Sequence, residues 1–103
     1  MAELVIKKAD DILAEQKESK IKQVKKKAHE VIEDRFPYYH RENLRNKIKS
    51  DIPDPYNGGR VRDISVVDNF IDDIINQSNT MENEVDNLTT IDEVENYNID
   101  YNY

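Results

Sequence analysis

The histidines are the first residues in this sequence whose type and spacing could support chemistry. His29 and Glu33 stand four residues apart, which places both on one face of a helix, a spacing that can hold a metal ion. The only other histidine, His40, follows a proline, and two histidines with scattered carboxylates do not complete a metal site. We therefore expect neither a metal nor any other cofactor.

Nucleophilic and acid–base catalysis find equally little support. The sequence has no cysteine, and no serine lies beside a histidine or in a nucleophile elbow. The neighbouring acids Asp72 and Asp73 point to different faces of a helix, whereas Asp68 and Asp72 share a face that is expected to be exposed to solvent. We expect a protein that is not an enzyme.

Basic residues form two groups that could contact phosphate. Residues 17–27 contain six lysines and one glutamate, and the pair Gly58–Gly59 before Arg60 could form an anion-binding backbone nest. The lysine run has no arginine or aromatic residue for reading bases, and such runs are more often solvated surface. Nucleic acid is therefore the less favoured partner. The candidate phosphate contacts are Lys22, Lys25, Lys26, Lys27, Arg60 and Arg62.

Residues 78–103, the acidic tail, carry the strongest signal for binding. They hold seven acids and no base, which equals the net charge of −7 of the whole chain. Apolar residues recur every third position from Val85 to Tyr97, and Thr90 with Glu93 matches a capping box. This combination is typical of a segment that lies apolar side down in a groove of a protein partner. The expected partner-binding residues are Val85, Leu88, Ile91, Val94, Tyr97, Tyr101 and Tyr103.

Helices are the elements expected to position these groups. Residues 3–35 lack glycine and proline, and their apolar side chains predict either one long helix or two helices that meet near residues 17–19. Pro37 ends this region, because the residue before a proline is pushed out of the helical conformation. The apolar stripe through which the body could dock or self-associate is Ile21, Val24, Ala28 and Val31.

The rest of the body contains a short helix, a loop and a third helix. The pattern predicts helix over 39–49 and loop over 50–62, where Pro53 and Pro55 argue against a paired strand. A capping box starting at Ser65 predicts a helix over 65–77. The expected core is Ile21, Val24, Val31, Phe70, Ile71 and Ile74.

The predicted fold is therefore all-α. It consists of a small helical hairpin or three-helix body over residues 1–77, followed by an extended acidic tail over residues 78–103 that contributes little to the fold. No apolar run is long enough to span a membrane, there is no signal peptide, and the lack of cysteine fits the reducing cytoplasm. The abundance of Asn, Ile, Lys and Tyr indicates an AT-rich genome, such as that of a low-GC bacterium or its phages.

One segment resembles parts of two known families. Residues 51–59 read Asp-Ile-Pro-Asp-Pro-Tyr-Asn-Gly-Gly and resemble the general-acid loop of low-molecular-weight tyrosine phosphatases, whose cysteine nucleophile this chain lacks. With Arg60 and Arg62, the same stretch resembles the Gly-Gly-Arg linker of phage late-transcription regulators. Those proteins carry a helix-turn-helix further on, where this chain has its acidic tail. Neither resemblance assigns a family or an activity.

Two functions remain open. The favoured one is a non-enzymatic adaptor or assembly component, such as a phage or virion structural protein, which forms oligomers or larger assemblies and docks on a protein partner through its acidic tail. The alternative is a small regulator or inhibitor whose acidic tail occupies a nucleic-acid-binding groove. The first predicts large complexes, and the second predicts a discrete complex that weakens steeply with salt.

Overall fold

The computed structural model describes residues 9–103 and is mostly helical, as expected. Helix α1 (Ala9–Arg35) is continuous, which decides between the one-helix and two-helix predictions for the described part; residues 3–8 lie outside it. The polar stretch over residues 15–20 does not interrupt α1, because every residue in it is compatible with a helix. The helix ends before Pro37, as the sequence predicts.

One end of the molecule is formed by α2 (Tyr38–Arg45) and a two-stranded antiparallel ribbon, β1 (Ile52–Pro53) with β2 (Arg60–Val61). The prediction of a strandless loop was wrong here. Both strands of a two-stranded ribbon are edge strands, where proline is tolerated. The turn between them is closed by hydrogen bonds from Gly58 N to Asp54 O (2.8 Å) and from Asp54 N to Gly59 O (3.1 Å).

Helix α3 (Ile64–Asp86) is longer than the predicted helix over 65–77, and the expected boundary between residues 77 and 78 lies inside it. The extension has a physical cause, since residues 78–86 contain no helix breaker and Met81 and Val85 continue the buried stripe. The N-cap is Asp63 and not Ser65: the Asp63 carboxylate accepts a hydrogen bond from Ser65 N at 2.9 Å.

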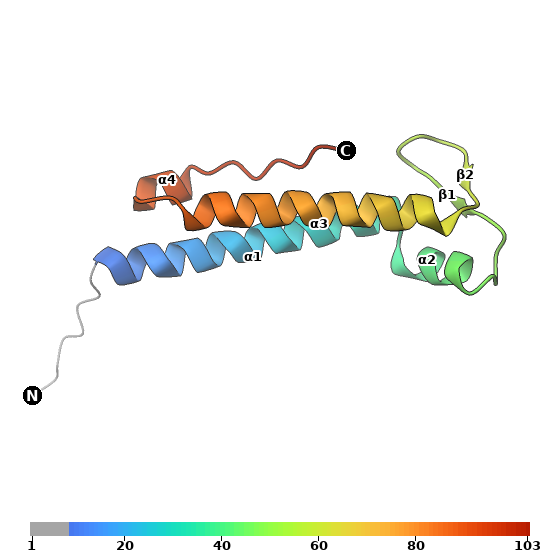
Figure 1. Cartoon of the computed structure of the whole chain (residues 1–103), viewed down its shortest axis with the longest axis horizontal. Helices are drawn as coiled ribbons and strands as arrows, with labels where there is room; N and C mark the ends of the chain where they lie inside the picture. Colours follow the sequence, from blue (N-terminus) through green and yellow to red (C-terminus); the bar gives the residue numbers. More distant parts are fainter. Residues whose placement is uncertain (1–8) are drawn as a thin grey trace, which may run out of the picture.

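The last helix, α4 (Ile91–Glu95), begins at the predicted capping residue. The Thr90 hydroxyl accepts a hydrogen bond from Glu93 N at 3.2 Å. Residues 96–103, here called the C-terminal segment, then run back along the hairpin that α1 and α3 form (Figure 1). Figure 1 also shows that α4 lies at the opposite end of the molecule from α2 and the ribbon, so the shape is a rod.

The core follows the inner faces of α1 and α3. Of the six predicted core residues, Val24, Val31, Phe70 and Ile74 are buried, while Ile21 and Ile71 are half-buried. The core also includes residues outside the predicted body, namely Met81, Val85, Val94 and Tyr101. The expectation that the acidic tail contributes little to the fold was therefore wrong, because a hairpin of two helices alone leaves these apolar surfaces in water. Within residues 9–103 no helix is long and apolar enough to cross a membrane.

Lys47 follows α2 in a left-handed conformation, with φ at 59°. The hydrogen bonds from Ile48 N to Asn43 O (2.9 Å) and from Lys47 N to Leu44 O (3.2 Å) form a Schellman motif, in which this position is usually glycine. We expect Lys47→Gly to raise the free energy of unfolding by about 0.5–1 kcal/mol, since glycine removes the steric strain. Urea unfolding measures this; a lower stability than wild type would contradict the strain.

Candidate functional site

Hydrogen bonds of Tyr101 and Asn102 hold the C-terminal segment on the hairpin. The buried Tyr101 hydroxyl donates a hydrogen bond to Val24 O at 2.7 Å. The Gln77 side chain donates to Asn102 O and accepts from Asn102 N, both at 2.6 Å. Each backbone group of Asn102 is thus paired by one side-chain amide, much as a neighbouring strand would pair it.

The two outer tyrosines extend this seat in both directions. The Tyr97 hydroxyl donates to a Glu84 carboxylate oxygen at 2.8 Å. The ring of Tyr103 stacks on that of Tyr56, with centroids 5.3 Å apart and planes 23° apart. The segment is consequently held from α4 to the ribbon loop. We call the surface of α1 and α3 that it covers the hairpin groove.

Lysines of α1 fix the acidic tail at the other end. Lys17 Nζ donates to Asp86 O at 2.6 Å and Lys20 Nζ to Glu95 O at 3.4 Å, so each lysine lies at the C-terminus of a helix. Helix C-termini attract cations, because their last carbonyl groups carry partial negative charge. Lys25 adds an ion pair to Glu82 at 3.3 Å. The basic run and the acidic tail therefore bind each other within one chain.

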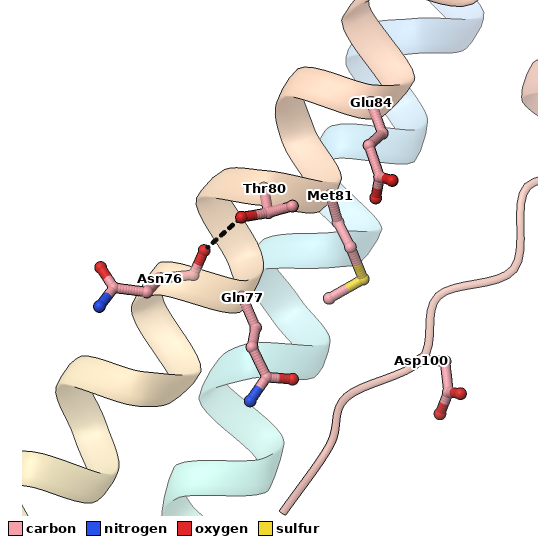
Figure 2. Close-up of a pocket in the computed structure, with 6 residues that line it drawn as sticks. All are labelled: Asn76, Gln77, Thr80, Met81, Glu84 and Asp100. Atoms are coloured by element: carbon pink, nitrogen blue, oxygen red, sulfur yellow. Dashed lines mark hydrogen bonds between the residues drawn. The ribbon is translucent and has the colours of Figure 1, made fainter.

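A cavity of about 320 Å³ remains between α3 and the C-terminal segment. Figure 2 shows Met81 and Glu84 of α3 pointing toward the C-terminal segment, on which Asp100 lies. The lining residues are Asn76, Gln77, Thr80, Met81, Glu84 and Asp100. Their polar groups are amides, a hydroxyl and two carboxylates.

The predicted partner-binding residues are mostly occupied within the chain. Val85, Val94 and Tyr101 are buried, Leu88, Ile91 and Tyr97 are half-buried, and Tyr103 is exposed. Val85 belongs to α3 and Val94 to α4, so both pack within the folded chain, and of the buried and half-buried members only Tyr97 and Tyr101 lie on the C-terminal segment. As folded, the buried members of the row face the hairpin and not a separate partner, since the hairpin offers the nearest apolar surface.

The predicted phosphate contacts do not come together. Lys22 pairs with Glu18 and Lys25 with Glu82, while Lys26 and Lys27 lie beside Ile99 of the C-terminal segment. Arg60, at the far end of the rod, pairs with Asp51. Arg62 lines a separate cavity beside Arg45 and Lys47. The lysine run and the ribbon arginines thus lie on different parts of the molecule.

A half-buried aromatic cluster with a buried ion pair joins the ribbon to the hairpin, and sequence reasoning missed it. Arg35 Nε lies 3.1 Å and its Nη2 3.0 Å from the two carboxylate oxygens of Asp54. The guanidinium also lies over the Phe70 ring, 4.6 Å from its centroid. The pKa of Asp54 is lowered, chiefly by the hydrogen bond from Arg35 and further by those from the amides of Asn57 and Tyr56. The turn-forming Asp54-Pro55 step was the available sequence signal.

The histidine site is not assembled. The Glu33 carboxylate accepts hydrogen bonds from Tyr38 N and from the Arg41 guanidinium, which leaves it engaged in joining α1 to α2. Among the described residues, no group of three or more His, Cys, Asp and Glu side chains could hold a metal ion. Comparison with known proteins found no family model, no curated protein and no solved structure that matches this chain.

Alkaline pH should loosen the C-terminal segment. Burial raises the pKa of Tyr97 to about 12, and its hydrogen bond to the Glu84 carboxylate acts in the same direction. The folded chain therefore holds this proton more tightly than the unfolded chain, in which a tyrosine pKa is about 10. The stabilisation is complete below about pH 10 and is lost as the pH rises toward 12. Urea unfolding at a series of pH values should show a steeper alkaline decline for wild type than for Tyr97→Phe; equal declines would contradict this.

Proposed function

We propose that the chain is a non-enzymatic adaptor or assembly component, and that the hairpin groove with the C-terminal segment is its interaction element. The observation that carries this proposal is the seat of the segment: an extended peptide whose anchor, Tyr101, is buried between two helices. Extended peptides that fill preformed grooves are a common mode of protein recognition. Here both halves of such a contact are present in one chain.

The C-terminal segment of one copy can also bind the hairpin groove of a second copy. The side-chain contacts of Tyr97, Tyr101 and Tyr103, and the bonds of Asn102 to Gln77, are made to groups of α1, α3 and the ribbon loop, which a second copy presents in the same arrangement. Exchange of the segment between copies therefore conserves the contacts and changes only the connection at Asn96. The partner that this geometry supports best is thus a second copy of the chain.

Concentration decides which arrangement predominates. A segment tethered by a short connection sees its own groove at an effective concentration on the order of millimolar. In dilute solution the segment should consequently fold back on its own molecule. Where many copies are held close together, as in a growing assembly, a neighbour's groove competes and the exchanged contacts link the copies.

Two complementary full-length variants test the exchange. Tyr101→Ala removes the anchor but leaves the groove intact, whereas Gln77→Glu with Thr80→Glu places two acids in the groove opposite Asp100 and leaves the segment intact. We expect each variant alone to be monomeric by light scattering. An equimolar mixture should form a 1:1 heterodimer, because one chain supplies the groove and the other supplies the segment.

The matched control combines all three substitutions in one chain. Mixed with either parent variant, it provides no direction in which an intact segment meets an intact groove, so the mixture should remain monomeric. Absence of a heterodimer in the complementary mixture, with both variants folded by circular dichroism, would contradict exchange between copies.

A second candidate function, inhibition of a nucleic-acid-binding protein, is favoured by the exposure of the acidic residues in the tail. Asp86, Asp92, Glu93 and Glu95 are exposed at the α4 end of the rod, and Asp100 is exposed on the C-terminal segment beside α3. Such a surface could imitate phosphates and occupy the nucleic-acid-binding groove of another protein. In that case Asp92→Asn with Glu93→Gln and Glu95→Gln should abolish binding to that protein, while the complementary heterodimer above should still form.

A further inference from the structure

The end of the rod formed by α2 and the ribbon contains a basic cavity of about 610 Å³. Its lining is Leu44, Arg45, Lys47, Lys49, Ser50, Arg62, Asp63 and Ile64. Four of these residues are cations and one is an acid. The Asp63 carboxylate caps α3 by accepting a hydrogen bond from Ser65 N and keeps its negative charge. With four cations against this one acid, the lining carries a net positive charge.

Three of the four cations have no ionic partner in the part of the chain that the structure describes. Arg45 bonds to Asp68, with Nη2 at 2.6 Å from Oδ1. Among residues 9–103, no carboxylate lies within ion-pair distance of Lys47, Lys49 or Arg62. Like charges around one cavity repel each other, and an anion placed between them relieves that repulsion.

Lys47 contributes a positive charge to this cavity from an unusual backbone conformation. Its left-handed conformation, with φ at 59°, is one that glycine adopts without strain and lysine does not. The conformation itself belongs to the Schellman motif that ends α2. The lysine keeps a charge there that glycine would lack.

Aromatic side chains adjoin the basic cavity. A second cavity, of about 440 Å³, shares Lys49 and Ser50 with the first and is also lined by Tyr39 and His40. Tyr39 is 62% exposed, and its ring centroid lies 4.0 Å from that of His40. An exposed tyrosine beside unpaired cations provides a stacking surface for a base and charges for the neighbouring phosphates.

We propose that this end of the protein binds single-stranded nucleic acid. Lys47, Lys49 and Arg62 contact phosphates, and the Tyr39 ring stacks on a base. Single strands fit better than duplex, because a duplex presents no free base face to the tyrosine. The acidic end of the rod, around α4, repels the strand and confines binding to the α2 end.

Fluorescence anisotropy of full-length protein with a labelled oligothymidine of about 15 nucleotides tests this site over a series of salt concentrations. The triple variant Lys47→Gln, Lys49→Gln and Arg62→Gln should bind at least about tenfold more weakly at low salt. Its salt dependence, log K against log salt, should be shallower by about 2, the value for three phosphate contacts on a single strand.

The matched control makes the same change in charge on α1, with Lys22→Gln, Lys26→Gln and Lys27→Gln. We expect this control to bind within about threefold of wild type, since those lysines lie on α1, apart from the α2 end. Equal weakening of both triple variants, or no binding by wild type at low salt, would overturn the site.

Tyr39→Ala separates nucleic acid from other polyanions. With the cations intact, loss of the stacking surface should weaken oligothymidine binding at least about fivefold and leave binding to a polyglutamate peptide unchanged. If Tyr39→Ala binds oligothymidine as well as wild type does, no base stacks on this ring, and the proposal is overturned in favour of a general polyanion site.

Discussion

Replacing Phe70 by alanine should lower the free energy of unfolding by about 3–5 kcal/mol, enough to unfold much of so small a protein. Phe70 is 7% exposed and packs edge-on against Phe36, with ring centroids 5.8 Å apart, and against Tyr56 at 6.3 Å. The substitution leaves a cavity where α1, α3 and the ribbon loop meet. Urea unfolding followed by circular dichroism measures the loss.

Ile75→Ala is the matched control on the same helix. Ile75 is 45% exposed, so its removal leaves no enclosed cavity and should cost less than about 1 kcal/mol. If the two substitutions proved equally mild, the ring of Phe70 would not be the centre of this packing.

Replacing Asp54 by alanine should cost about 3–5 kcal/mol, because it leaves the half-buried Arg35 guanidinium without its partner. Asp54 is 5% exposed and also holds the ribbon turn through hydrogen bonds from Tyr56 N (3.1 Å) and Asn57 N (3.3 Å). The control Asp51→Ala breaks the more exposed pair with Arg60 and should cost less than about 1 kcal/mol. Similar losses for both variants would contradict a special role for the buried pair.

Acid should weaken the same contact. The pKa of Asp54 is lowered in the folded chain, so its contribution to stability is present above the ordinary aspartate pKa of about 4 and is lost as the pH falls through the folded value. Urea unfolding between neutral and acidic pH should thus show a smaller acid-induced decline for Asp54→Ala than for wild type.

The helices were predictable from local pattern, whereas their ends were less so. The spacing of Val24, Ala28 and Val31 requires one buried helical face, and α1 has it. The end of α3 at Asp86 was not predicted. The change in charge suggested that the helix ends near residue 77, whereas the buried residues Met81 and Val85 continue its apolar face. Periodicity of apolar residues reports helix extent better than net charge does.

The sequence alone could not predict which surface the apolar row from Val85 to Tyr97 packs against. Its spacing predicted a segment that lies apolar side down on a partner, but spacing does not say which surface it covers. The answer depends on contacts between residues far apart in the chain, such as Tyr101 with Val24. The Arg35–Asp54 pair was missed for the same reason: the two residues meet only after the ribbon folds onto α1.

The basic cavity beside α2 also arises from tertiary structure. Lys47 and Lys49 precede the ribbon, whereas Arg62 follows it, and the antiparallel pairing of β1 with β2 returns the chain to the same place. The sequence predicted phosphate contacts at Arg62 and at the lysines of α1, because charged residues are dense there. In the structure, Lys17, Lys20 and Lys25 of α1 instead bind the acidic tail.

The central claim is that the C-terminal segment occupies the hairpin groove, and one NMR measurement tests it most directly. In a dilute, isotope-labelled wild-type sample, nuclear Overhauser effects should connect the Tyr101 ring protons with protons of Val24, because the Tyr101 hydroxyl lies 2.7 Å from Val24 O. Residues 96–103 should also show chemical shifts away from random-coil values. Random-coil shifts throughout this segment, with no effect between Tyr101 and any residue of α1, would contradict the claim and remove the basis for exchange between copies.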